Sequence, residues 1–308
     1  MLDIQILIDR MLVILLLMGV GFASRKLGYT DAVSNQKLSR VVINVGQVGM
    51  ILGAVMTAEG AYTKQQALLM LGVSFALMFL ITAYGYLAPV ILRAKGPARG
   101  TYAFMAAFGN IGFVGMPIMS SVYGPESAFL VALFNIPFNL FVYSLGLTMV
   151  SGGAQKVRLS GKVFLTPPIL SCIVALVIFL LEIPFPKPVS DAMVTLGQLV
   201  LPVTLIVLGG SLGTIPVREL FRDPRMYGLM VLKLLVAPVM VWAVLRLFLH
   251  DELLVGVLTV TAAMPVAAAS TMLSIEYGGD EQLATKSVFL STLLCTATIP
   301  LVVWLLLT

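Results

Sequence analysis

The sequence predicts an all-α polytopic membrane protein. Of its 308 residues, 59% are hydrophobic and only 11% are charged, a composition that water-soluble domains do not reach. Apolar runs long enough to cross a hydrocarbon core of about 30 Å lie at 5–23, 40–58, 66–91, 101–122, 128–149, 162–181, 189–213, 227–249, 253–275 and 286–307. We therefore expect about ten transmembrane helices and no soluble domain.

Lysine and arginine are divided unevenly between alternate loops. One set of loops holds Arg25, Lys26, Lys37, Arg40, Arg93, Lys95, Arg99, Lys156, Arg158, Lys162, Arg218, Arg222, Arg225 and Lys286. The other set holds only Lys64, Lys187 and Arg246. Because basic loops stay on the cytoplasmic side, we expect a multi-pass protein of the cytoplasmic (inner) membrane with both termini outside. The net charge of +5 is then a topology signal, and no nucleic-acid partner is expected.

The first apolar run is expected to be a retained helix. Its positive pair, Arg25 and Lys26, follows the apolar stretch, whereas a cleaved signal peptide carries its positive charge before that stretch.

Two short matches indicate an internal repeat. The stretch Tyr123-Gly124-Pro125-Glu126 matches "YGGDE" at 277–281, and Gln47 in "NVGQVGMIL" matches Gln198 in "TLGQLVLPV". Both offsets are about half of the chain. Since each half would contain five helices, an odd number, the second half would enter the membrane upside down. The prediction is two inverted five-helix repeats, residues 1–150 and 151–308.

The fourth and ninth predicted spans contain residues that are poor choices for a lipid-facing helix. The fourth holds Gly109, Asn110, Gly112 and Gly115, and the ninth holds Pro265 before the small residues 267–270. Glycine and proline favour non-helical backbone there, so both helices are predicted to break in mid-membrane, where inverted-repeat carriers bind substrate. The alternative is that small residues permit close helix packing and that Asn110 bonds a neighbouring helix.

Three stretches carry a family resemblance: "GNIGFVGMPIMSSVYG" (109–124), "FNIPFNLFVYSLG" (134–146) and "AAMPVAAASTMLSIEYGGDEQLATKSVFLSTLL" (262–294). They resemble the auxin efflux carrier family, which includes plant PIN-formed carriers and bacterial members, and the resemblance covers essentially the whole chain. It implies a fold similar to that of bile acid:sodium symporters. A scaffold domain would comprise helices 1, 2, 6 and 7, and a transport domain helices 3–5 and 8–10, with the broken helices 4 and 9 crossing at their unwound centres.

The resemblance also implies site residues. The crossing would fall at Gly109–Asn110, followed by Ile111, and at Pro265–Val266, with Asn110 a ligand of the substrate carboxylate. Plant members usually have proline where Gly109 stands. This chain also has only "SGGAQKVRLSGK" between its fifth and sixth helices, in place of the long cytoplasmic loop of many plant carriers.

Four further amides lie within the predicted spans: Gln47, Gln198, Asn135 and Asn139. Asn135 and Asn139 are four residues apart and share a helix face, so they are candidates to line the substrate cavity. The glutamines are candidates because they occur at equivalent places in the two repeats. For all four, hydrogen bonding between helices is the alternative.

Acidic residues are nearly absent from the predicted spans, since thirteen of the fourteen lie in predicted loops or at helix ends and only Asp9, in the first turns of its helix, lies further inside a span. A sodium/proton antiporter needs a titratable acid near the midplane and is therefore disfavoured. Sodium symport stays open, because amides and backbone carbonyls could coordinate Na⁺. Lys233 in the eighth span is expected to snorkel toward the interface; the alternative is that it lends positive charge to an anion path.

The expected function is secondary transport of a small organic anion, such as a carboxylate or an auxin-like acid, by an elevator-type or rocking motion. One histidine, His250, and two cysteines, Cys172 and Cys295, make no catalytic or metal-binding set, so no enzyme activity, metal or cofactor is expected. The alternatives are a sodium-coupled organic-anion symporter and a membrane sensor or accessory subunit that binds the ligand without turnover. The organic anion and the bilayer are the expected partners, and a homodimer is left open.

Overall fold

The computed structural model describes residues 4–57, 63–115, 118–119, 123–124, 127–152, 166–212 and 223–307. Glu126 of the repeat match and the basic residues Lys156, Arg158, Lys162, Arg218 and Arg222 lie outside the described residues. Within the described ranges the secondary structure is helical, and strand-like pairing is limited to one isolated bridge between Gly109 and Val266. The chain is therefore an all-helical protein, as the sequence predicts.

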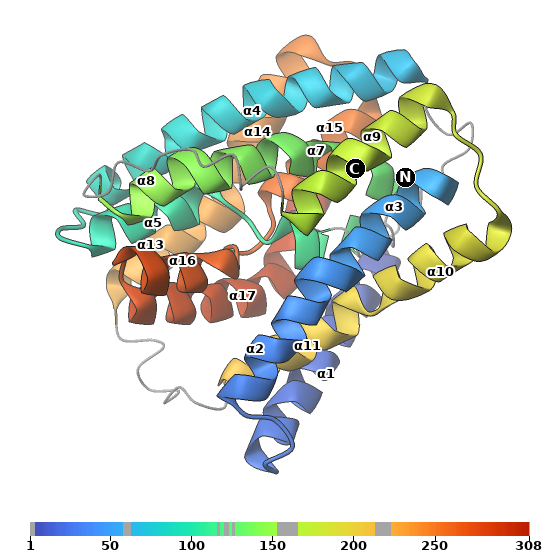
Figure 1. Cartoon of the computed structure of the whole chain (residues 1–308). Coiled ribbons are helices and arrows are strands. Elements are labelled where there is room, and N and C mark those ends of the chain that lie inside the picture. The colour runs from blue at the N-terminus through green and yellow to red at the C-terminus, as the bar shows by residue number, and fades with distance from the viewer. Residues whose placement is uncertain are drawn as a thin grey trace.

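The elements follow one another along the chain as α-helices interrupted by short π-helical turns, written η (Figure 1). The N-terminal half contains α1 (Ile4–Lys26), α2 (Ala32–Val41), η1 (Val42–Gly46), α3 (Gln47–Thr57), α4 (Lys64–Ile91), α5 (Ala98–Ala107), η2 (Ile111–Gly115), α7 (Ser127–Phe141), η3 (Val142–Gly146) and α8 (Leu147–Val150). The C-terminal half contains α9 (Pro167–Leu181), α10 (Lys187–Gln198), α11 (Val200–Leu212), α13 (Pro224–Val231), η5 (Leu232–Val236), α14 (Ala237–Phe248), α15 (Glu252–Ala262), α16 (Ala269–Tyr277) and α17 (Glu281–Leu307).

Six helical segments among the described residues are long and apolar enough to cross a membrane. They are 32–57, 64–91, 129–150, 187–211, 224–248 and 281–307. Helices α9 and α15 are apolar but shorter. Several membrane-length apolar helices in one chain are the mark of a multi-pass membrane protein.

The second helical segment begins eight residues earlier than the predicted span at 40–58, because a capping box starts α2 at Ala32. The Asp31 carboxylate accepts a hydrogen bond from the backbone N–H of Ser34, and the Ser34 hydroxyl accepts one from the backbone N–H of Asp31. These bonds satisfy donors that a helix N-terminus leaves free, and they hold the pKa of Asp31 below its usual range. The polar first turns of α2 lie outside the apolar run, so hydropathy alone did not reveal them.

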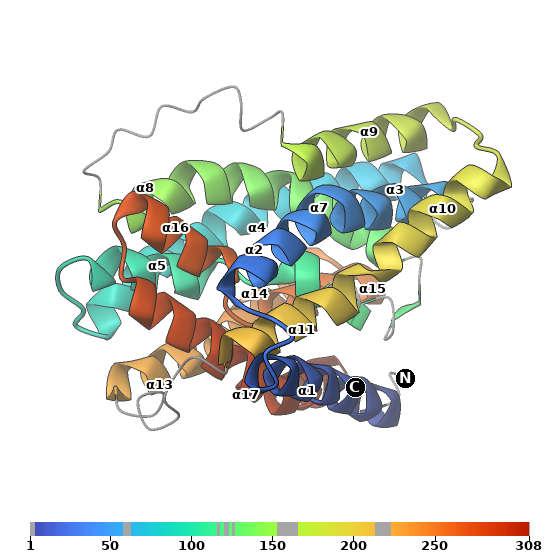
Figure 2. The same ribbon diagram turned by 60° about the horizontal axis from the view of Figure 1, so that its bottom comes forward.

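The helices form two packed groups (Figures 1 and 2). In the first helix group, α1 packs along α11, and α3 packs against α9 and α10. In the second helix group, α4 packs on α5 and α7, α14 packs on α15, and α16 packs on α17. Contacts of α1 with α17 and of α7 with α9 and α3 join the groups. The two ends of the described chain lie near each other in both views.

Glycine permits the closest contact inside the first helix group. A methyl group built on Gly21 of α1 or on Gly209 of α11 would overlap backbone atoms of the opposite helix, at Ile206 and Met18 respectively. Small residues let two helix backbones approach closely where lipid supplies no hydrophobic driving force. The α1–α11 pair is therefore packed backbone against backbone.

Candidate functional site

Two helices of the second group are interrupted, and their interruptions are hydrogen-bonded to each other. Helix α5 ends at Ala107, and Phe108 is extended. The backbone N–H of Asn110 donates to the Pro265 carbonyl (2.7 Å), and the N–H of Ala267 donates to the Phe108 carbonyl (3.1 Å). We call residues 108–110 and 265–267 the junction. These bonds satisfy backbone groups that would otherwise be unpaired in a non-aqueous interior.

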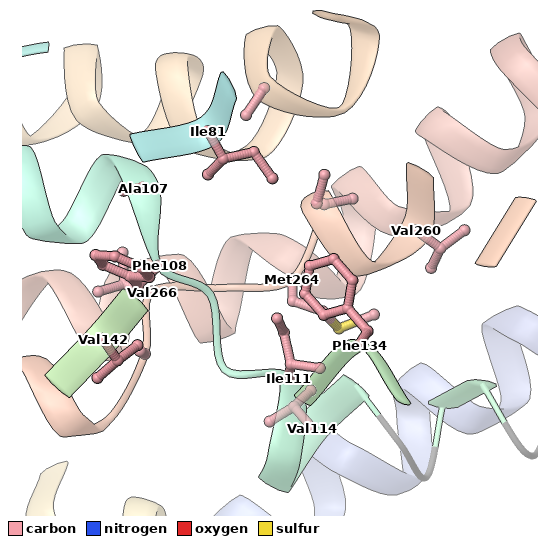
Figure 3. Close-up of a cluster of buried hydrophobic side chains, with 14 of the residues drawn as sticks. Ile81, Ala107, Phe108, Ile111, Val114, Phe134, Val142, Val260, Met264 and Val266 are labelled. Atoms are coloured by element: carbon pink, nitrogen blue, oxygen red, sulfur yellow. The ribbon is translucent and has the colours of Figure 1, made fainter. Parts of the chain in front are cut away.

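The junction lies in an apolar surrounding (Figure 3). Phe108 and Val266 are each fully buried, and Ile111 is 3% exposed. The backbone N–H of Val266 donates to the Ser291 hydroxyl of α17 at 3.0 Å. Polar groups at this place are therefore few and are held in a medium of low dielectric, where each interaction is strong.

Asn110 is the polar side chain at the junction, and it is 3% exposed. The backbone carbonyl of Asn110 accepts hydrogen bonds from the backbone N–H groups of Val114 (3.2 Å) and Gly115 (3.1 Å), and η2 begins at the next residue. Its side-chain nitrogen Nδ2 is buried and has no hydrogen-bond partner among the described residues. Other buried polar atoms of the described residues also have no partner, but the Asn110 amide is the one that lies at the junction, where it is free to donate to a ligand acceptor.

The two glutamines of the repeat match lie in different surroundings. Gln47, the first residue of α3, is 8% exposed, and a methyl group built on Gly112 of η2 would overlap its Nε2 atom. Gln198, the last residue of α10, is exposed. The structure therefore brings Gln47 of the first helix group against the interrupted segment of the second, and it does not bury Gln198 there.

Asn135 and Asn139 use their amide nitrogens within their own helix. Asn135 Nδ2 donates to the Val131 carbonyl (3.1 Å), and Asn139 Nδ2 donates to the Asn135 carbonyl (2.8 Å). Asn135 is buried and Asn139 is partly buried. These donors serve α7, which contains Pro137, rather than a neighbouring helix.

Lys233 points to the junction, so the prediction that it snorkels to the interface is wrong. It lies in η5, is only 2% exposed, and its Nζ atom is 3.5 Å from the carbonyl oxygen of Ala107. A methyl group built on Gly109 would be 3.3 Å from the same Nζ. Sequence reasoning gave this residue a minor role, although a lysine deep inside the apolar run "MVLKLLVAP" is itself a signal of function.

A small pocket borders the junction on the Lys233 side. Its lining includes Ala107, Gly109, Ile111, Lys233, Thr261 and Ala262, and Asn110 is not among the lining residues. The space available is about 10 Å³, about enough for one water molecule. Lys233 and the Asn110 amide thus belong to different surroundings of the same junction.

No group of three or more His, Cys, Asp or Glu side chains that could hold a metal ion occurs within the described ranges. Cys172 and Cys295 are both free and buried. The polar chemistry at the junction consists of backbone groups, the Asn110 amide, the Lys233 amino group and the hydroxyls of Ser291 and Thr261.

Membrane-length apolar helices indicate a multi-pass membrane protein, and a pair of interrupted helices joined inside the protein is typical of transporters. The family model described as "Membrane transport protein" matches residues 6–163 and 158–304. The chain therefore belongs to this family, the auxin efflux carrier-like membrane transport proteins, which is a family of transporters rather than enzymes.

Named relatives agree with the family. The chain is 26% identical over 301 residues to an "Uncharacterized transporter" of Methanothermobacter thermautotrophicus, with 95% of this chain and 96% of the relative covered. It is 27% identical over 239 residues to a "Putative malonate transporter" of Rhizobium meliloti, with coverage of 74% and 72%. It is 24% identical over 311 residues to an "Uncharacterized transporter" of Methanocaldococcus jannaschii, with coverage of 97% and 98%.

Proposed function

We propose that this protein is a secondary carrier of small organic anions and that the substrate carboxylate binds at the junction through Asn110. The observation that carries the proposal is the buried Asn110 Nδ2 atom without a hydrogen-bond partner. A carboxylate oxygen is a strong acceptor for such a donor. Pro265, whose carbonyl accepts the Asn110 backbone N–H, and Val266, which pairs with Gly109, position Asn110 but offer no charge of their own.

The proposed architecture is ten transmembrane helices in two inverted repeats of five. The family model matches the chain in two stretches of similar length that overlap at residues 158–163, which supports a division of the chain close to its middle. The bridge between Gly109 and Val266 pairs one interruption from each half. Neighbouring chain ends agree with an even number of crossings. The two helix groups would then serve as the scaffold domain and the transport domain.

Transport requires one helix group to move relative to the other. Asn110 is buried, and η2 contacts α11 and abuts Gln47 of α3. An organic anion would reach Asn110 only after this contact between the groups opens. Since the first helix group packs through close backbone contacts, we propose that it stays fixed while the second group carries the junction across the membrane, as in an elevator.

Malonate is the first substrate to test, because a relative with 27% identity is named as a malonate transporter. Other small mono- and dicarboxylates, and aromatic acids such as indole-3-acetate, present the same carboxylate to Asn110. The proposal is therefore a carboxylate carrier. The rest of the substrate would be recognised by side chains that are packed around Asn110 in this structure.

Counterflow in proteoliposomes tests the proposal without knowledge of the coupling ion. Vesicles containing the purified protein and a high concentration of unlabelled malonate are diluted into trace labelled malonate, and the label inside is followed over time. A carrier accumulates label transiently and saturably, whereas protein-free vesicles do not. Saturable binding of malonate without any flux would instead support a sensor or accessory subunit. A panel of other carboxylates as internal substrate extends the test if malonate is not bound.

A further inference from the structure

Lys233 is a buried cation whose partners among the described residues are few. Its side chain is 2% exposed, its recorded hydrogen bond to the Ala107 carbonyl is long at 3.5 Å, and neither ion pair found among the described residues includes it. Burying an ammonium without compensation is strongly unfavourable. A protonated Lys233 therefore requires partial negative charge from its surroundings.

Two helix ends supply that charge. Helix α5 ends at Ala107 and helix α15 ends at Ala262, and both residues line the small pocket with Lys233. The C-terminal end of a helix carries roughly half a negative charge. The two ends together offset about one positive charge, which matches the single charge of an ammonium.

The backbone holds Lys233 in place. Lys233 is the second residue of the π-helical turn η5, whose first carbonyl, that of Leu232, accepts from the backbone N–H of Ala237. The same carbonyl accepts a 2.7 Å hydrogen bond from the Tyr84 hydroxyl of α4. A π-helical turn inside a helix often marks a functional position, and here the turn is fixed from a second helix.

We propose that the carbonyl ends of α5 and α15 form a monovalent cation site that the Lys233 ammonium occupies as a tethered ion. Carriers with interrupted helices use such helix ends to hold a free coupling cation. Because the Lys233 ammonium is attached to the chain, the junction stays closed without a free cation. The consequence for ion coupling rests on the proposed transport function, but the cation site itself does not.

The test is the thermal stability of Lys233→Ala in different salts. The purified variant is melted in equal concentrations of choline, sodium, potassium and methylammonium chloride, because choline is too large for the site and controls for ionic strength. We expect a melting temperature several degrees below that of the unaltered protein in choline, with recovery of at least half of the loss in methylammonium or sodium. The unaltered protein should melt alike in all four salts.

Lys233→Met is the matched control, since it keeps most of the side-chain volume but removes the charge. Its melting temperature should be lowered in every salt, because the stem leaves no room for a free ion. The proposal is overturned if Lys233→Ala is as stable as the unaltered protein in choline. It is also overturned if Lys233→Ala melts at the same low temperature in choline, sodium and methylammonium, or if both variants fail to fold in every salt. Absence of malonate counterflow with the unaltered protein would contradict only the proposed function, not the cation site.

Discussion

The backbone N–H of Asn110 donates a 2.7 Å hydrogen bond to the carbonyl of Pro265, a residue in the other half of the chain. This bond joins two interrupted helices, so the backbone from which the Asn110 side chain projects is held in place inside the protein. Its free Nδ2 atom then has a defined position before any ligand arrives. A preorganised donor of this kind lowers the cost of ordering on binding.

Gln47 and Gln198 are a matched pair, because the sequence places them equivalently and the structure does not. Gln47→Ala should lower the malonate counterflow rate by an order of magnitude or more, since its amide lies against η2 at the contact between the helix groups. Gln198→Ala should transport normally, because its side chain is exposed. Initial counterflow rates, corrected for the amount of reconstituted protein, measure both. Equal loss in the two variants would contradict the distinction.

Gly112→Ala should disturb the contact between the two helix groups. The added methyl group would overlap Gln47 Nε2, and overpacking of a filled interior costs about 1–3 kcal/mol. The melting temperature should fall, and the double variant with Gln47→Ala should recover much of the loss, since contacting residues are coupled.

Gly115→Ala is the control for Gly112→Ala, because a methyl group there would meet Met264 at an ordinary 3.4 Å. Destabilisation by Gly115→Ala as large as that by Gly112→Ala would show that glycine in η2 matters for its backbone rather than for the Gln47 contact.

The membrane orientation is testable by cysteine labelling of intact cells. Thr63→Cys and Pro188→Cys should react with an impermeant thiol reagent from outside. Both positions are exposed and belong to the set of loops with few basic residues, which is expected outside. Lys95→Cys, at an exposed position of a basic loop, should react only after permeabilisation. The native Cys172 and Cys295 are buried and should give little background. The reverse pattern would invert the topology.

Transport should persist when sodium is replaced by potassium. Asp9, the acidic residue predicted within a span, is exposed on α1, and in the proposed cation site Lys233 takes the place that a free sodium ion would need. Initial uptake rates in matched sodium and potassium buffers measure this. A strict sodium requirement would favour the sodium-coupled symporter, with amides and carbonyls as ion ligands.

Local chemistry made part of the site predictable from the sequence. Gly109 and Pro265 disfavour a continuous helix through their own backbone geometry, and the structure interrupts both helices at these residues. Asn110 could be selected because an amide beside such residues needs a partner. These inferences required no knowledge of how distant helices pack.

The surroundings of Gln198 and Lys233 depend on tertiary structure, which neither the repeat match nor the expectation of snorkelling takes into account. A residue's face is inferred at about 100° per residue in a regular α-helix, and a π-helical turn adds a residue and shifts that face. Lys233 lies inside such a turn. Gln198 lies where α10 ends, two residues before α11 begins, so its direction depends on how the two helices meet rather than on the repeat.

The dissociation constant of malonate for Asn110→Ala, measured beside the melting temperature of the same purified variant, tests the central claim most directly. Removing a hydrogen bond to a charged group costs about 1.5–3 kcal/mol, so affinity should fall by about one to two orders of magnitude while the melting temperature changes little. Asn110→Asp should bind more weakly still, because it places negative charge beside an anion at low dielectric. Unchanged affinity in both variants, with or without a loss of stability, would contradict the assignment of Asn110 as the carboxylate ligand.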